Sequence, residues 1–107
     1  MNNLISISPC YCGFHLNYEN GYSISIQFQA GTYSDNNLKM YGKEEETKTV
    51  EVAIVNSNGD LINLEKLIKN SISDYALETI AAYVPIEKAL DFAREYTFRK
   101  VLYEMEE

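Results

Sequence analysis

The chain has 107 residues, of which 46% are hydrophobic and 23% are charged. This length and composition fit one globular domain, and they exclude wholesale disorder and a second domain with its own core. Sixteen acidic residues against nine basic ones give a formal net charge of −7, so direct nucleic-acid binding is not expected. An acidic surface suits a basic protein partner, although net charge often serves solubility alone.

Signals for membrane insertion or export are not readable in the sequence. No apolar run approaches the roughly 18 residues of a membrane span, and the N-terminus lacks a basic segment followed by an apolar one. Cys10 and Cys12 are separated by one residue, which is poor spacing for a structural disulfide. We therefore expect a reducing cytosolic setting and no membrane contact.

Three short strands are predicted at the N-terminal end of the chain. Residues 1–8 (MNNLISIS) favour an edge strand, which Pro9 would end. Residues 10–19 and 22–29 each alternate apolar with polar side chains. This alternation is typical of strands that bury one face.

The turn at Asn20-Gly21 sets the register of the first hairpin. A three-residue loop at 19–21 would pair Leu16 with Ile24 and keep the apolar side chains of both strands on one face. A two-residue loop would place polar side chains opposite apolar ones. The longer loop, with Gly21 in a left-handed conformation, is therefore predicted. The face that carries Ile24 is expected to contact the C-terminal helix.

A long polar connection follows at residues 30–46. Its length exceeds that of a normal hairpin loop, and its two Gly and its run of three Glu predict a mobile loop. Tyr33, Leu38, Met40 and Tyr41 are apolar enough to dock on another protein. We therefore expect this loop to contact a partner.

A second hairpin is predicted in the middle of the chain. Residues 47–55 favour a strand most strongly, because β-branched residues alternate there. A three-residue turn at 57–59 would place Val52 opposite Leu64. This register predicts a short return strand at residues 61–64.

The following segment is less uniform. Residues 65–70 favour a helical turn with Asn63 as its cap. Residues 71–84 fit both an amphipathic helix and a strand, with a slight preference for a strand at 80–84.

Residues 85–104 are predicted to form a helix that begins with Pro85 at its first position. A second apolar stripe of Phe98, Leu102 and Met105 points away from the main one. It would serve as a partner or self-association surface, or it would cover a sheet edge. The stripe expected to face the core consists of Ile86, Ala89, Leu90, Ala93, Tyr96 and Thr97.

Together these elements predict a single α+β domain over residues 1–107. Its antiparallel sheet of four to five strands is built from bulged hairpins and packs against the C-terminal helix. The long loop and the second helical stripe are the surfaces that this fold leaves for a partner. The predicted partner-binding residues are Tyr33, Leu38, Met40, Tyr41, Glu44, Glu45, Glu46, Phe98, Leu102 and Met105.

Cys10, Cys12 and His15 are the residues of the chain most suited to bind a soft metal. A structural zinc site needs a second pair of ligands elsewhere, which the sequence does not supply. A Cys–His nucleophile is also disfavoured, because Cys12 and His15 point to opposite faces of a regular strand. We expect small buried cysteines, no metal, no cofactor and no catalytic residue, so the chain is not predicted to be an enzyme.

Three segments carry a resemblance to a group of proteins. They are residues 20–27 (NGYSISIQ), residues 50–54 (VEVAI) and Tyr83-Val84-Pro85 at the start of the helix. They resemble a loose group of small phage and prophage accessory proteins with an N-G-Y strand, an E-V-A-I strand and a Y-V-P helix start. The resemblance implies an antiparallel sheet with a C-terminal helix, and the cytoplasm of the infected bacterial host. It carries over no functional residue.

Members of this group often act on a host protein. The resemblance thus implies a phage-encoded inhibitor of a host protein, such as an anti-CRISPR or other anti-defence protein that binds a nucleic-acid-binding defence complex. A sponge for a small ligand or nucleotide is an alternative, although Arg94 and Arg99 are the only arginines. A structural or assembly protein of the virion is another, and the sequence leaves a homodimer open.

Overall fold

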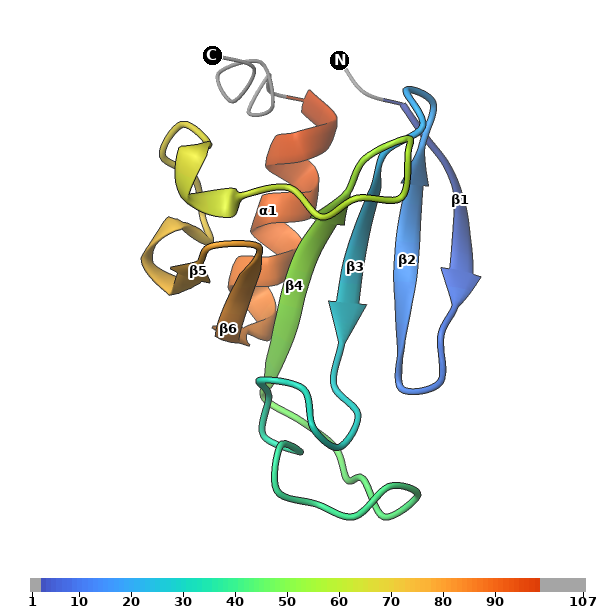
Figure 1. Ribbon diagram of the computed structural model, residues 1–107, viewed down its shortest axis with the longest axis vertical. Coiled ribbons are helices and arrows are strands. Elements are labelled where there is room, and N and C mark those ends of the chain that lie inside the picture. Colours follow the sequence, from blue (N-terminus) through green and yellow to red (C-terminus); the bar gives the residue numbers. More distant parts are fainter. Residues whose placement is uncertain (1–2, 99–107) are drawn as a thin grey trace.

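The computed structural model describes residues 3–98 of the chain. These residues form one antiparallel sheet with an α-helix on one face (Figure 1). The predicted α+β class is confirmed. The sheet has six strands in the order β1-β2-β3-β4-β6-β5. The elements in chain order are β1 (Leu4–Pro9), β2 (Gly13–Tyr18), β3 (Ser23–Gln27), β4 (Thr49–Val55), the 3₁₀ helices η1 (Leu64–Lys66) and η2 (Ser73–Tyr75), β5 (Ala76–Leu77), β6 (Ile80–Pro85) and α1 (Ile86–Phe98).

The first hairpin has the predicted register. Leu16 lies opposite Ile24, and the Tyr18 N–H donates to the Tyr22 carbonyl at 2.9 Å around the turn. Gly21 adopts φ +89°, a left-handed conformation that glycine reaches without steric cost. Leu16 and Ile24 both belong to the buried core, so the alternation predicted the correct face.

The second hairpin forms only in part. Val55 and Leu61 make a single bridge, and beyond this bridge the chain leaves the sheet. The predicted pairing of Val52 with Leu64 is wrong, because Ala81 of β6 takes the place opposite Val52. Strand β6 pairs with β4 at Thr49, Val50 and Val52.

The segment before α1 contains both a helical turn and strands. Residues 80–84 lie in β6, as the slight preference for a strand predicted. Asn63 caps η1, since its side-chain oxygen accepts from the Glu65 N–H at 2.9 Å. The strand β6 then runs directly into α1 at Pro85, which fixes where the helix starts on the sheet.

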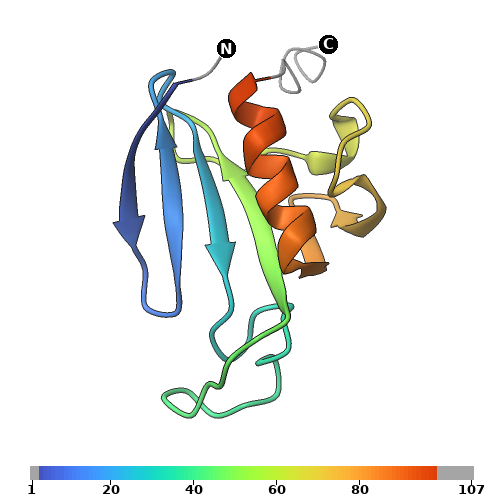
Figure 2. The same ribbon diagram turned by 180° about the vertical axis from the view of Figure 1, so that it is seen from behind.

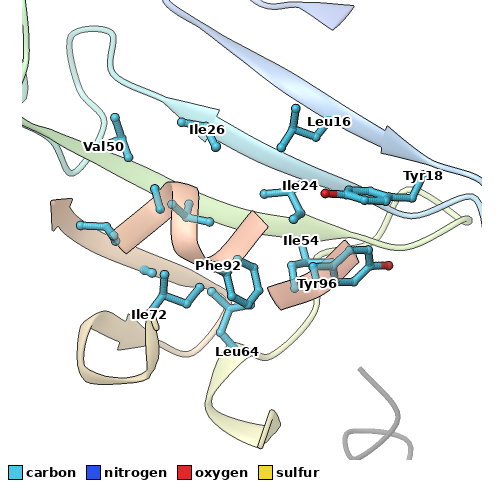
Figure 3. Close-up of a cluster of buried hydrophobic side chains, with 14 residues drawn as sticks. Leu16, Tyr18, Ile24, Ile26, Val50, Ile54, Leu64, Ile72, Phe92 and Tyr96 are labelled. Carbon is cyan, nitrogen blue, oxygen red and sulfur yellow. The ribbon is translucent and has the colours of Figure 1, made fainter. Parts of the chain in front are cut away.

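One face of α1 supplies the centre of the core. Ala89, Phe92 and Tyr96 are buried against the apolar face of the sheet (Figure 3). The predicted stripe is wrong at its edge, since Ile86 and Leu90 are 40% and 57% exposed. Phe92 lies outside that stripe, yet the i, i+3, i+7 spacing of the three buried residues places it at the centre of the buried face.

Tyrosine contacts hold the C-terminal half of α1 on the sheet. The rings of Tyr18 and Tyr96 meet edge to face with their centroids 4.5 Å apart (Figure 3). Thr97 Oγ1 donates to the Tyr18 hydroxyl at 3.3 Å, and Asn20 Nδ2 donates to the Tyr96 hydroxyl at 3.0 Å. Burial raises the pKa of Tyr18, and the Thr97 hydrogen bond lowers it by less, so this contact stays neutral at physiological pH.

The opposite face of the sheet is polar. Asn17 Nδ2 donates to Ser6 Oγ at 3.1 Å and to Ser8 Oγ at 2.7 Å. Asn17 Oδ1 in turn accepts from Ser23 Oγ at 2.8 Å. This amide links side chains of three neighbouring strands, so the polar face satisfies part of its own hydrogen bonding without a covering layer.

Strand β1 is an exposed edge of the sheet. Its register with β2 shifts between Leu4 and Ser6, which leaves Ile5 as a bulge, and Pro9 occupies its last position. A bulge and a proline both interrupt the row of backbone donors and acceptors at an edge.

Replacing Phe92 by Ala should lower the free energy of unfolding by about 3–5 kcal/mol, because the removal of a buried ring leaves a cavity. Phe98→Ala removes the same atoms where the side chain is 66% exposed, and it should change the free energy by no more than about 0.5 kcal/mol. Urea unfolding followed by circular dichroism measures both. Equal losses would contradict the assignment of the buried face of α1.

Gly21→Val should destabilise the fold by about 1–3 kcal/mol, because valine resists a positive φ. The added Cβ would also lie 2.9 Å from Ser57 Cβ. Gly59→Val is the matched control, since Gly59 has φ +87° and no atom within 4 Å of an added Cβ. Thermal unfolding should therefore show the larger loss for Gly21→Val, and the reverse order would refute the steric part of this account.

Candidate functional site

The chain between β3 and β4 forms a loop that extends beyond the end of the sheet (Figure 1). Sequence analysis predicts mobility for residues 30–46, and that property stays a prediction. The structure adds a defined path for the loop. Side chains of three loop residues hold this path by hydrogen bonds to backbone groups.

Asn36 closes the neck of the loop from inside. Its side chain is buried, and Nδ2 donates to the carbonyls of Phe28 at 2.8 Å and Glu45 at 2.9 Å. Its Oδ1 accepts from the Glu45 N–H at 3.0 Å. One amide therefore ties the outgoing arm of the loop to the returning arm, and both the NH₂ group and the oxygen of Asn36 have partners.

Glu44 gathers donors from three parts of the chain. Its Oε2 accepts from the Ala30 N–H at 2.9 Å, and its Oε1 accepts from the Gly42 N–H at 2.9 Å and the Tyr11 hydroxyl at 3.0 Å. The pKa of Glu44 is lowered, chiefly by the Ala30 N–H, because a carboxylate accepts these bonds better when it is ionised. This residue therefore links the loop to the β1–β2 turn.

Asp35, in the outgoing arm of the loop, fastens this arm to the start of β4. Its carboxylate accepts from the Lys48 N–H and from Thr49 Oγ1, each at 2.8 Å. The Lys48 N–H is the main cause of the lowered pKa of Asp35.

We call the loop backbone held by Asn36, Glu44 and Asp35 the frame. Large apolar side chains of this region are exposed to solvent. Leu38, Met40 and Tyr41 are 94%, 73% and 71% exposed, and Tyr11 is 56% exposed. The rings of Tyr11 and Tyr41 stack, with their centroids 4.6 Å apart and their planes 6° from parallel. We call these four residues the tip cluster.

The other predicted site residues are not members of the tip cluster. Tyr33 lies against Tyr83 of β6, with ring centroids 6.1 Å apart. Glu45 forms an exposed ion pair with Lys39 at 3.2 Å, a contact that contributes little to stability. Phe98 ends α1 at the far end of the molecule from the loop (Figure 1).

The structure joins only part of the predicted partner-binding set. Leu38, Met40 and Tyr41 share the tip cluster, and Glu44 supports it. The remaining residues of the second helical stripe, Leu102 and Met105, lie outside the described residues.

Tyr11 is not among the partner-binding residues predicted from the sequence. It contacts Tyr41 and Glu44, which lie about thirty residues away in the chain, and no local pattern in the sequence indicates these contacts. In the structure, Tyr11 lies in the turn between β1 and β2, two residues after Pro9, and its φ is +37°. A large aromatic residue at such a position is unusual and points to a contact outside the turn.

Cys12 offers little nucleophilic character. Cys10 and Cys12 lie in the turn between β1 and β2 and are partly exposed. The prediction that they are buried is wrong, because β2 begins only after them. Partial burial and, to a smaller extent, the Glu44 charge raise the pKa of Cys12, which disfavours the reactive thiolate. Over residues 3–98, no three His, Cys, Asp or Glu side chains are grouped closely enough to bind a metal ion.

Comparisons with protein-family models, curated proteins and solved structures give no match for this chain. The resemblance to small phage accessory proteins therefore stays a prediction. Within the part of the chain that the structure describes, no helix has the length and apolar character needed to cross a membrane.

The frame of the tip cluster should loosen in acid. The pKa values of Glu44 and Asp35 are lowered in the folded chain, so their contribution to stability is complete above the ordinary values of 4.5 and 3.8 and is lost as the pH falls through the folded values. Near-ultraviolet circular dichroism of the Tyr11–Tyr41 stack, recorded from neutral pH downward, should show this loss.

Glu44→Gln is the matched variant for this titration. It keeps one acceptor oxygen but cannot ionise, so its stack signal should be weaker at neutral pH and should change less in acid. A wild-type signal that stays constant until the whole sheet unfolds would contradict the role given to the carboxylates.

Proposed function

We propose that this chain is an interaction protein that docks onto a basic surface of another protein through its tip cluster. The observation that carries the proposal is the exposure of Leu38, Met40, Tyr41 and Tyr11 on a frame fixed by hydrogen bonds. Grouped apolar and aromatic side chains mark binding surfaces. A frame that is already ordered loses less conformational entropy on binding than a mobile loop would.

The acidity of the chain suggests the kind of partner. A net charge of −7 favours encounter with a basic surface, such as one that normally binds nucleic acid. A protein bound there would compete with the nucleic acid, so binding alone would inhibit the partner. The resemblance adds a setting to this proposal: a phage-encoded protein in the cytoplasm of an infected bacterium, directed against a host defence complex.

The alternative of a nucleotide sponge finds less support. Phosphate recognition requires cationic side chains or convergent backbone N–H groups. The hollow between α1 and the sheet is lined by apolar residues, Thr47 and Glu46, with no Lys or Arg among its lining residues. A role as an assembly protein of the virion has no particular observation in its favour.

The tip cluster should be required for partner capture. Tagged protein used as bait in a bacterial lysate that contains nucleic-acid-binding defence complexes should retain a specific partner. A double variant, Leu38→Ser with Tyr41→Ser, should weaken binding of that partner by at least about 30-fold, the effect of losing a binding hot spot. Quantitative binding to the purified partner measures the change.

Leu77→Ser is the matched control, because Leu77 is also exposed, at 57%, but lies on the edge strand β5. It should leave the affinity unchanged. If the tip variant and the control bind the partner equally well, the tip cluster is not the docking surface.

A further inference from the structure

The helix α1 leaves part of the apolar face of the sheet uncovered. Figure 2 shows α1 in front of β4 and β6, with β3 and then the blue strands β2 and β1 extending to one side. Between the helix and these strands lies a groove of about 310 Å³. Phe14 and Ile26 of the sheet line one side of the groove, and Ile86 and Leu90 of α1 line the other.

The apolar surface continues beyond the groove toward the edge of the sheet. Ile7 of β1 lies opposite Leu16, and Pro9 lies opposite Phe14. Because opposite residues share a face, Ile7 and Pro9 are on the same side of the sheet as the groove. Ile7 is 60% exposed, so a strip of apolar side chains runs from Leu90 across β2 to β1.

The charge that lines this groove is acidic. Glu46 is the one charged residue among those that line the groove, and the neighbouring Thr47 hydroxyl is already engaged by the Thr49 carbonyl. On the helix side, the exposed residues next to the groove carry both signs, with Glu87 after Ile86 and Arg94 one turn after Leu90. A Lys or Arg side chain that entered the groove would therefore find opposite charge at Glu46.

We infer that this groove binds an amphipathic helix of a protein partner that has an apolar stripe flanked by Lys or Arg. Helices on one face of a sheet or in a bundle pack with their axes about 8–10 Å apart, and the strip beside α1 offers such a place. Anchors at i, i+3, i+4 and i+7 would enter the groove. This inference rests on the proposed function, since it specifies which segment of a protein partner the molecule accepts.

Other occupants fit the groove less well. A second copy of the chain would bring together two acidic molecules, each with a net charge of −7. An extended peptide added to β1 would meet an edge interrupted by the Ile5 bulge and Pro9. Anionic ligands would lie against Glu46 with no lining cation to balance their charge.

A displayed library of random 16-residue peptides tests the inference without knowledge of the partner. Peptides selected on the wild-type protein, after depletion on the Leu90→Asp variant, should be rich in Lys or Arg and should carry apolar residues at helical spacing. Leu90 is exposed, so this variant should fold normally. A selected peptide should bind at least about tenfold more weakly to Leu90→Asp and to Glu46→Lys.

Glu65→Lys is the charge-matched control, because Glu65 is exposed on η1 and does not line the groove. It should leave peptide binding within about twofold, the scatter expected of a distant surface charge. Amide chemical-shift changes on adding a peptide should centre on Phe14, Ile26 and Leu90.

Several outcomes would overturn the inference. These are failure to enrich any peptide, enrichment of peptides without cationic residues, and equal weakening by Glu65→Lys and Glu46→Lys. Sedimentation that shows a dimer dispersed by Leu90→Asp would assign the groove to a second copy instead.

The two proposals fail separately. The double variant Leu38→Ser, Tyr41→Ser should bind the selected peptides as the wild type does, because the tip cluster does not line the groove. Loss of partner capture by this variant alone would support the tip cluster and not the groove. Loss of peptide binding by Leu90→Asp alone would support the groove and not the tip cluster.

Discussion

A single helix cannot cover a sheet of six strands, and much of this molecule follows from that mismatch. Neighbouring strands lie about 4.8 Å apart, so the sheet is roughly 24 Å wide, whereas a helix with its side chains is only about 10–12 Å across. The helix α1 seals the core over β4 and β6, where Phe92 and Val52 are fully buried. On the edge strand β1, apolar side chains of the same face, such as Ile7, stay exposed.

The loop beyond the sheet is organised by a different principle. It has few apolar residues that turn inward, so it cannot be held by a core of its own. Asn36, Glu44 and Asp35 replace that core by accepting or donating hydrogen bonds to the backbone of both arms. Polar side chains therefore order the frame, and apolar side chains are left to face solvent. This arrangement inverts the usual placement of polar and apolar residues.

Sequence reasoning predicted the local features and missed those that depend on distant parts of the chain. The position of Gly21 and the parity of Leu16 and Ile24 were enough to predict the first register, because a hairpin is decided within a dozen residues. The same reasoning failed at Leu64, since Ala81 of β6, which is 17 residues further along the chain, lies opposite Val52 instead. The Tyr11–Glu44 contact likewise joins segments whose approach only the completed sheet determines.

The interrupted edge of β1 has a consequence for the behaviour of the protein at high concentration. Ile5 and Ile7 are exposed on this strand, and apolar edge strands are common starting points for intermolecular β-stacking and amyloid. The bulge at Ile5 and the proline at position 9 interrupt the regular edge to which another strand would have to hydrogen-bond. The edge strand β1 can thus keep apolar side chains exposed for specific contacts while the molecule resists fibre formation.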